Sequence, residues 1–158
     1  LVAFVSNGLD QLEIEFGAEP AHGPIDTTRA LFAALDAEFD SATDVWRPIF
    51  STLKQGPGSH GMGEVGDRVV AFIEADFAKA AADGLFVIDC DVKRLARHVF
   101  TTRMNRLEKW ATGAIEWDAY RDSSDLGLEL TLAAVLADDN ARRLALMAAG
   151  IRHQPLSC

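Results

Sequence analysis

A segment near the C-terminal end of this chain is apolar on nearly every side. Residues 126–137 read LGLELTLAAVLA, in which only Glu129 and Thr131 are polar. These two residues lie about 200° apart on a helical wheel, so a helix over this segment has no solvent face. Such a helix must run through the centre of its domain or be covered on one side by a second chain. Either arrangement predicts a helical fold in this part of the protein.

Helical periodicity extends over most of the remaining sequence. Apolar residues recur at spacings of three and four in the segments that we expect to be helices, which are 1–16, 26–39, 44–53, 64–82, 91–113 and 138–149. No segment predicts a strand with a partner. The 158 residues therefore indicate one all-α domain of six to eight helices, spanning residues 1–158.

Local signals predict where these helices begin and end. Asp26 and Asp91 are suitable N-caps, residues 122–124 offer a cap for the apolar helix, and Gly84 suits a helix C-terminus. The segment 55–66 holds five glycines and is expected to be a flexible surface loop. A strand over residues 84–89 would have no partner strand, so this stretch is expected to be an ordered connection.

Charge and composition exclude several classes of protein. Fifteen Lys and Arg residues against 24 Asp and Glu give a net charge of −9, which is unsuited to nucleic-acid binding because phosphate contacts need clustered bases. No apolar run is long enough to cross a membrane, and no signal peptide is recognisable. Cys90 and Cys158 do not form a disulfide framework, so a cytoplasmic location is expected.

The start of the longest predicted helix carries a recognisable pattern, in which a Gly-Leu pair precedes two acids and two apolar positions: Gly84, Leu85, Asp89, Asp91, Leu95 and Ala96. That helix continues to Trp110, Gly113 and Ile115, and a polar turn then leads into the apolar segment. In order and spacing, nearly the whole chain resembles the ligand-binding and dimerisation domain of TetR-family transcriptional regulators.

The resemblance implies a TetR-like helical bundle that forms a homodimer through its last two long helices. It also implies a repressor that binds a small-molecule effector, with operator DNA contacted only by an N-terminal helix-turn-helix domain. That domain is absent from this sequence, and Leu1 falls about where it would end. We therefore expect the chain to be a fragment of a longer regulator.

Aromatic residues concentrate in the region where the resemblance implies a ligand cavity, and an apolar or aromatic effector is expected there. On the long helix, Phe100, Thr101 and Met104 lie at spacings that put them on one surface. The predicted ligand-binding residues are Trp46, Phe50, Phe72, Phe100, Thr101 and Met104. The residues predicted to meet their symmetry mates in the dimer are Trp110, Leu128, Leu132 and Val135.

A second hypothesis is a helical protein-protein interaction module without a small-molecule site. A solid core around Phe50, Phe72 and Phe100 would favour that module, whereas a closed cavity there would favour the sensor. Catalysis and metal binding are not predicted: the sequence shows no nucleophile elbow, phosphate loop or dinucleotide fingerprint, and His60 has no second ligand at metal spacing. Acids such as Asp76 are expected on solvated helix faces. We therefore expect neither an enzyme nor a bound cofactor.

Overall fold

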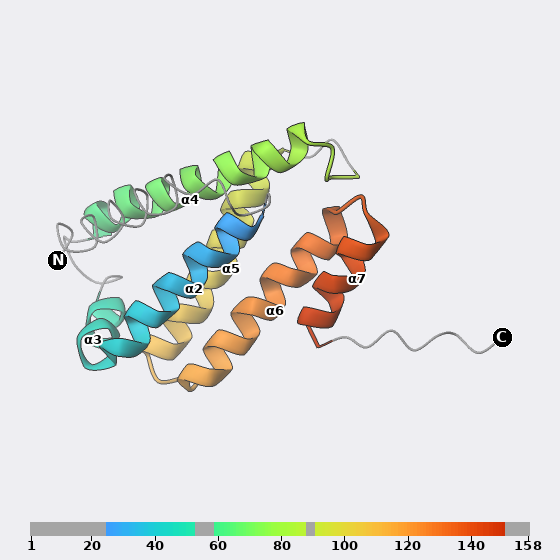
Figure 1. Cartoon of the computed structure of the whole chain (residues 1–158). Helices are drawn as coiled ribbons and strands as arrows, with labels where there is room; N and C mark the ends of the chain where they lie inside the picture. The colour runs from blue at the N-terminus through green and yellow to red at the C-terminus, as the bar shows by residue number, and fades with distance from the viewer. Residues whose placement is uncertain (1–24, 53–58, 88–90, 151–158) are drawn as a thin grey trace.

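The computed structural model describes residues 25–52, 59–87 and 91–150, and these residues form an all-α fold (Figure 1). Its helices are α2 (Asp26–Ser41), α3 (Thr43–Thr52), α4 (Ser59–Ala82), α5 (Val92–Ala111), α6 (Trp117–Val135) and α7 (Asp139–Ala148). The all-α prediction is confirmed for this part of the chain. The helix predicted over residues 1–16 lies outside the described residues. None of the described helices is long and apolar enough to cross a bilayer.

The helices pack around α5. Helix α4 crosses one end of α5, α6 returns alongside it after a short turn, and α2 lies against both α5 and α6 (Figure 1). Helix α3 packs on the C-terminal half of α5, and α7 folds back on the end of α6. This arrangement places α2 beside α6, although the two helices are far apart in the sequence.

Two clusters of buried side chains form the core. The larger one joins α2, α4, α5 and α6 around Ile73, Phe77 and Leu132, all of which are fully enclosed. The smaller one lies at the α3 end and is mainly aromatic, with members Phe39, Trp46, Phe50, Leu107, Trp110, Ala111 and Tyr120. Its rings make edge-to-face contacts, such as Phe39 with Trp46 at 5.2 Å between ring centroids. The α3 end is therefore filled by side chains.

Several predicted helix ends are confirmed. The Asp91 side chain accepts a hydrogen bond of 3.0 Å from the Arg94 backbone N–H and caps α5. Gly84 follows α4 with a positive φ of 73°, a conformation in which a side chain would be strained.

The start of α2 differs from the prediction, because its cap comes from another helix. Asp76 of α4, expected on a solvated face, is 8% exposed and accepts hydrogen bonds from the Thr28 backbone N–H (2.9 Å) and hydroxyl (2.6 Å). It also accepts one from the Ile25 N–H at 3.2 Å. Asp26, the predicted cap, lies in the first turn and pairs with Arg29 at 3.0 Å. A carboxylate at a helix N-terminus satisfies N–H groups that have no partner within the helix.

The predicted glycine-rich loop over residues 55–66 is wrong from Ser59 onward, because α4 begins there. Gly66 lies against the Phe100 ring of α5, and a Cβ atom at this position would come within 3.2 Å of two ring atoms. Val65 and Val69 are buried beside it. The burial of these neighbours offsets the poor helix propensity of glycine.

The apolar helix also differs from the prediction. Helix α6 begins at Trp117, so residues 122–124 lie within it and do not cap it. Its inner face repeats every fourth residue, through Tyr120, Ser124, Leu128 and Leu132. Within a single chain this helix is not covered on every side, because Leu126 and Leu130 are 38% and 40% exposed, so of the two arrangements expected from the sequence a fully central helix does not hold.

The connection after α4 does find a partner. Phe86 forms an isolated antiparallel bridge with Leu136, the Val87 N–H donates to the Val135 carbonyl (2.8 Å), and the Ala137 N–H donates to the Leu85 carbonyl (2.7 Å). The segment 84–89 was expected to lack any such pairing. The bridge ties the end of α4 to the end of α6.

Candidate functional site

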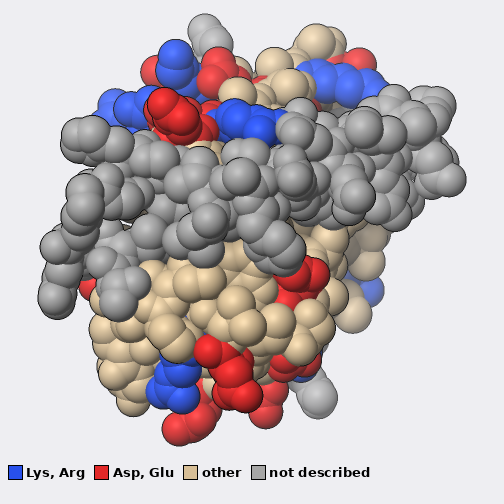
Figure 2. Space-filling model, turned by 90° about the vertical axis from the view of Figure 1, so that its left-hand side faces the viewer, with Lys and Arg blue, Asp and Glu red and all other residues tan. Residues whose placement is uncertain are grey.

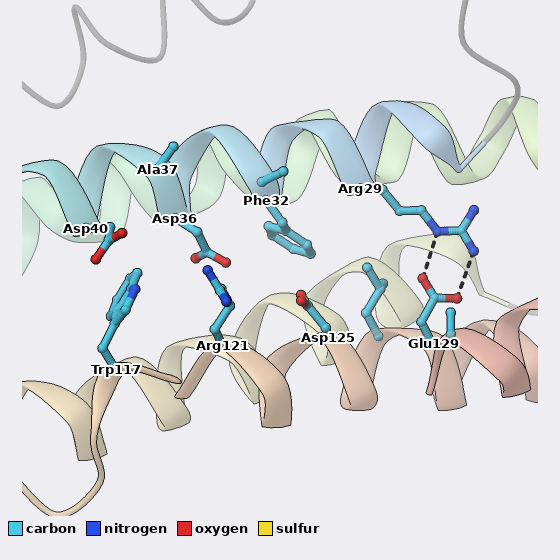
Figure 3. A pocket seen from close by; sticks show the side chains of 12 residues that line it. Arg29, Phe32, Asp36, Ala37, Asp40, Trp117, Arg121, Asp125 and Glu129 are labelled. Atoms are coloured by element: carbon cyan, nitrogen blue, oxygen red, sulfur yellow. Dashed lines mark hydrogen bonds and ion pairs between the residues drawn. The ribbon is translucent and has the colours of Figure 1, made fainter. Parts of the chain in front are cut away.

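A half-open groove lies between α2 and α6 and has a volume of about 530 Å³ (Figure 3). The residues that line it come from these two helices and from the end of α7: Arg29, Phe32, Ala33, Asp36, Ala37, Asp40, Trp117, Arg121, Asp125, Leu128, Glu129 and Ala148. Such a volume falls within the range of roughly 300–1,000 Å³ that is typical of small-molecule sites. The groove is therefore the candidate functional site.

An ion pair closes one end of the groove. Arg29 of α2 and Glu129 of α6 point toward each other (Figure 3), with Nε to Oε1 at 2.7 Å and Nη2 to Oε2 at 2.8 Å. The hydrogen bonds to Glu129 hold the pKa of Arg29 above its ordinary value. This bidentate geometry fixes the orientation of the two side chains as well as the distance between them. It joins the first turn of α2 to the C-terminal half of α6.

A second polar cluster lies behind the wall of the groove and reaches it at Asp36. Asp36, only 7% exposed, pairs with Arg103 of α5 and accepts a hydrogen bond of 3.1 Å from the Tyr120 hydroxyl. The Arg103 guanidinium lies 4.4 Å from the centre of the Phe32 ring, a cation–π contact. Burial raises the pKa of Tyr120 well above its ordinary value, so this hydroxyl stays a donor. Three helices therefore meet at one buried carboxylate.

The mouth of the groove carries further charge. Asp125 reaches within 3.7 Å of Arg103 Nη1, and its side chain is 60% exposed. Partial burial raises the pKa of Asp125, although the Arg103 charge opposes this shift. The lining holds four carboxylates and two guanidiniums, beside the apolar surfaces of Phe32, Leu128 and Trp117. Such walls suit a ligand with an apolar body and one or two polar groups. Because carboxylates outnumber guanidiniums, a cationic polar group on the ligand is favoured.

Sequence reasoning did not find this groove. Its signal is a charged stripe on each helix, with Arg29, Asp36 and Asp40 on one face of α2 and Arg121, Asp125 and Glu129 at every fourth residue of α6. Either stripe alone is typical of a solvated helix face. Only the pairing of α2 with α6 makes the two stripes into a site.

The structure does not bring the six predicted ligand-binding residues together. Trp46 and Phe50 are buried in the aromatic cluster, and Met104 packs against that cluster. Phe72 and Phe100 are partly buried against the larger core cluster, and Thr101 is exposed. None of the six lines the groove.

The four predicted dimer residues are buried within the single chain. Trp110 belongs to the aromatic cluster, Leu128 and Leu132 belong to the larger cluster, and Val135 is buried near the end of α6. Their burial is complete without a partner. The outward face of α6 presents Leu126 and Leu130 in their place.

The charge on the molecular surface is mixed. In the view onto the α3 end (Figure 2), basic and acidic side chains lie interspersed at the upper and lower edges of the described surface, without a continuous basic patch. Among the described residues there is also no group of three or more His, Cys, Asp and Glu side chains placed to hold a metal ion.

Comparisons of this chain with protein-family models, with curated proteins and with solved structures found no match.

Proposed function

We propose that this chain is the effector-sensing and dimerisation domain of a TetR-like transcriptional repressor, and that its effector binds in the groove between α2 and α6. The order of the sequence segments supports the TetR-like part of the proposal. The observation that carries the sensing part is the groove itself, because its volume of about 530 Å³ and its mixed lining match a small-molecule site.

The groove lining indicates the chemistry of the effector. Phe32, Leu128 and Trp117 provide apolar and aromatic contacts, while Asp40 and Asp125 provide exposed carboxylates at the mouth. The effector is an apolar or aromatic molecule, as the sequence predicts, and carries a basic or hydrogen-bond-donating group that meets one of these acids.

The position of the groove suggests how binding would be transmitted. A molecule seated between α2 and α6 changes the separation of these helices, which the Arg29–Glu129 pair otherwise holds. An effector that favours one separation over the other shifts the balance between two domain arrangements. In the full repressor this would change the spacing of helix-turn-helix domains outside these 158 residues. A coupling typical of allosteric proteins changes operator affinity about 5- to 150-fold.

A substitution that fills the groove tests the site. Ala33 is exposed and lines the groove, so Ala33→Trp adds an indole there without disturbing the core. A compound library is screened by thermal shift on the wild-type chain, and hits are titrated by calorimetry. We expect Ala33→Trp to weaken binding of the hits at least tenfold.

The matched control is Ala78→Trp, at an exposed position on α4 that does not line the groove. It should bind the same compounds with unchanged affinity. Equal binding by wild type and Ala33→Trp would place the effector elsewhere and contradict the proposal.

The interaction module without a small-molecule site remains the second candidate, and one observation favours it. Phe50 lies within a packed aromatic cluster, while Phe72 and Phe100 pack against the larger core cluster, and none of the three lines the groove. A screen in which no compound stabilises the wild-type chain would favour this module over the sensor.

The homodimer is also part of the proposal, with its contact moved to the outward face of α6. Leu126 and Leu130 lie one turn apart there and are each more than a third exposed. A twofold axis beside α6 would bring two copies of this apolar pair together. We expect sedimentation velocity to show a dimer at micromolar concentration, and the double variant Leu126→Glu/Leu130→Glu to be monomeric.

The matched control is the double variant Leu144→Glu/Met147→Glu, which charges the exposed apolar pair of α7. It should remain dimeric. Dissociation by the α7 variant alone would move the contact to α7, and a monomeric wild-type chain would rule out the homodimer.

A further inference from the structure

The two ends of the groove between α2 and α6 differ in how their charges are paired. One end is closed by the Arg29–Glu129 ion pair. At the other end, where α2 finishes and α6 begins, Asp40 of α2 and Arg121 of α6 line the groove (Figure 3). Neither of them forms an ion pair with any residue in the described ranges. Asp40 and Arg121 are called the open-end charges below.

The other charged residues of the lining already have partners. Glu129 is bound by Arg29 in bidentate geometry, and Asp36 and Asp125 share the Arg103 guanidinium, with Asp125 at 3.7 Å. A ligand that displaced Arg103 from Asp36 would leave a buried charge without its partner, which is costly. The open-end charges can meet a ligand without breaking any such pair.

The open-end charges have opposite signs and lie on opposite walls. Asp40 is an acceptor and Arg121 is a donor, and both side chains belong to exposed residues. Asp40 also lies in the last turn of α2, where the negative end of the helix dipole favours a nearby cation. A ligand with only a cationic group would meet Asp40 and be repelled by Arg121, and a purely anionic ligand would meet the reverse. A ligand that carries both charges satisfies both walls.

The lining beside the open-end charges is apolar. Trp117 adjoins them in Figure 3, and Phe32 and Leu128 lie further along the groove. Ala33 and Ala37 form the exposed part of the α2 wall, and their small side chains leave room for a bulky group. The polar group of a ligand at the open end would therefore be followed by an apolar or aromatic body.

We propose that the effector is an amphipathic zwitterion of the class of large apolar α-amino acids, with its ammonium group on Asp40 and its carboxylate on Arg121. The inference rests on the proposed function, in which the effector binds in this groove. It adds to that proposal a second, anionic group on the ligand and makes Arg121 the residue that selects for it. A guanidinium suits this role because it can bind a carboxylate through two parallel N–H donors.

Three probes with the same indole body separate the contributions of the two charges. L-Tryptophan carries both charged groups, tryptamine lacks the carboxylate, and indole-3-propionate lacks the ammonium group. Each probe is titrated into the wild-type chain by calorimetry at neutral pH. We expect L-tryptophan to bind about fivefold or more tightly than either single-charge probe, because each exposed contact contributes modestly.

Two substitutions assign each charge to its residue. Asp40→Asn should remove the advantage of L-tryptophan over indole-3-propionate, because the ammonium group loses its carboxylate. Arg121→Gln should remove the advantage over tryptamine, because the ligand carboxylate loses its guanidinium. Both positions are exposed, so both variants should fold.

The matched control is Asp118→Asn, which removes a charge at an exposed position on α6 that does not line the groove. It should keep both differences between the probes. Equal binding of L-tryptophan and tryptamine to the wild-type chain, or an unchanged ratio in Arg121→Gln, would overturn the zwitterion proposal. So would a failure of all three probes to bind while library compounds still bind wild type more tightly than Ala33→Trp, and in that case the groove would remain the effector site. If neither the probes nor any library compound bound, the proposed sensing function itself would fail.

Discussion

Asp36 shows at the scale of one residue how a buried charge is tolerated in this fold. Its carboxylate forms an ion pair with the Arg103 guanidinium of α5 and accepts a hydrogen bond from the Tyr120 hydroxyl of α6. Because both partners come from other helices, the carboxylate reports directly on how the helices are packed. Removing one partner of such a buried pair is more costly than removing an exposed charge, since the other charge is left without compensation.

We expect Tyr120→Phe to lower the free energy of unfolding by about 1.5–3 kcal/mol, because the ring stays in place and only the hydrogen bond to Asp36 is lost. Asp36→Ala should cost about 3–5 kcal/mol, since it leaves Arg103 buried without its main partner. Urea unfolding followed by circular dichroism measures both values. A Tyr120→Phe variant as stable as wild type would show that the hydroxyl does not contribute.

At the scale of the element, the existence of helices could be predicted from periodicity, but a helix start could be predicted only where its cap is local. Helix α2 begins where Asp76 of α4 accepts its free N–H groups, and a partner 48 residues away leaves no local signal. Helix α4 extends into a glycine-rich stretch because Gly66 packs against Phe100 of another helix. Where the cap is local, as at Asp91, the sequence was sufficient.

Two acids lie at the N-terminus of α2, Asp26 from α2 itself and Asp76 from α4, and comparing them tests whether the distant cap stabilises the helix. Asp76→Ala removes the carboxylate that caps α2 and should cost about 1–2 kcal/mol of unfolding free energy. Asp26→Ala removes only an exposed first-turn acid and should cost less than about 0.5 kcal/mol. Thermal unfolding compares the two variants. Equal losses would mean that α2 is stabilised by charge in its first turn and not by the cap.

At the scale of the whole molecule, the core and the candidate site differ in how far the sequence pattern predicts them. Residues that were predicted to bind a ligand or to form the dimer contact, such as Trp46 and Val135, are buried in the core of the single chain instead. The groove lies outside that pattern, because it is formed where two charged helix faces meet across a sequence separation of about a hundred residues. Periodicity reports which face of a helix is buried and does not report which helix lies opposite a polar face.

The Arg29–Glu129 pair has a consequence for how the chain folds during synthesis. Its two residues are separated by 100 positions in the sequence, and Asp36 and its partner Tyr120 are separated by 84 positions. Helix α2 therefore leaves the ribosome long before the partners of its polar face exist, and these contacts form late. Until α6 emerges, the charges on this face of α2 are compensated by water and by neighbours on the same helix, as where Asp26 pairs with Arg29.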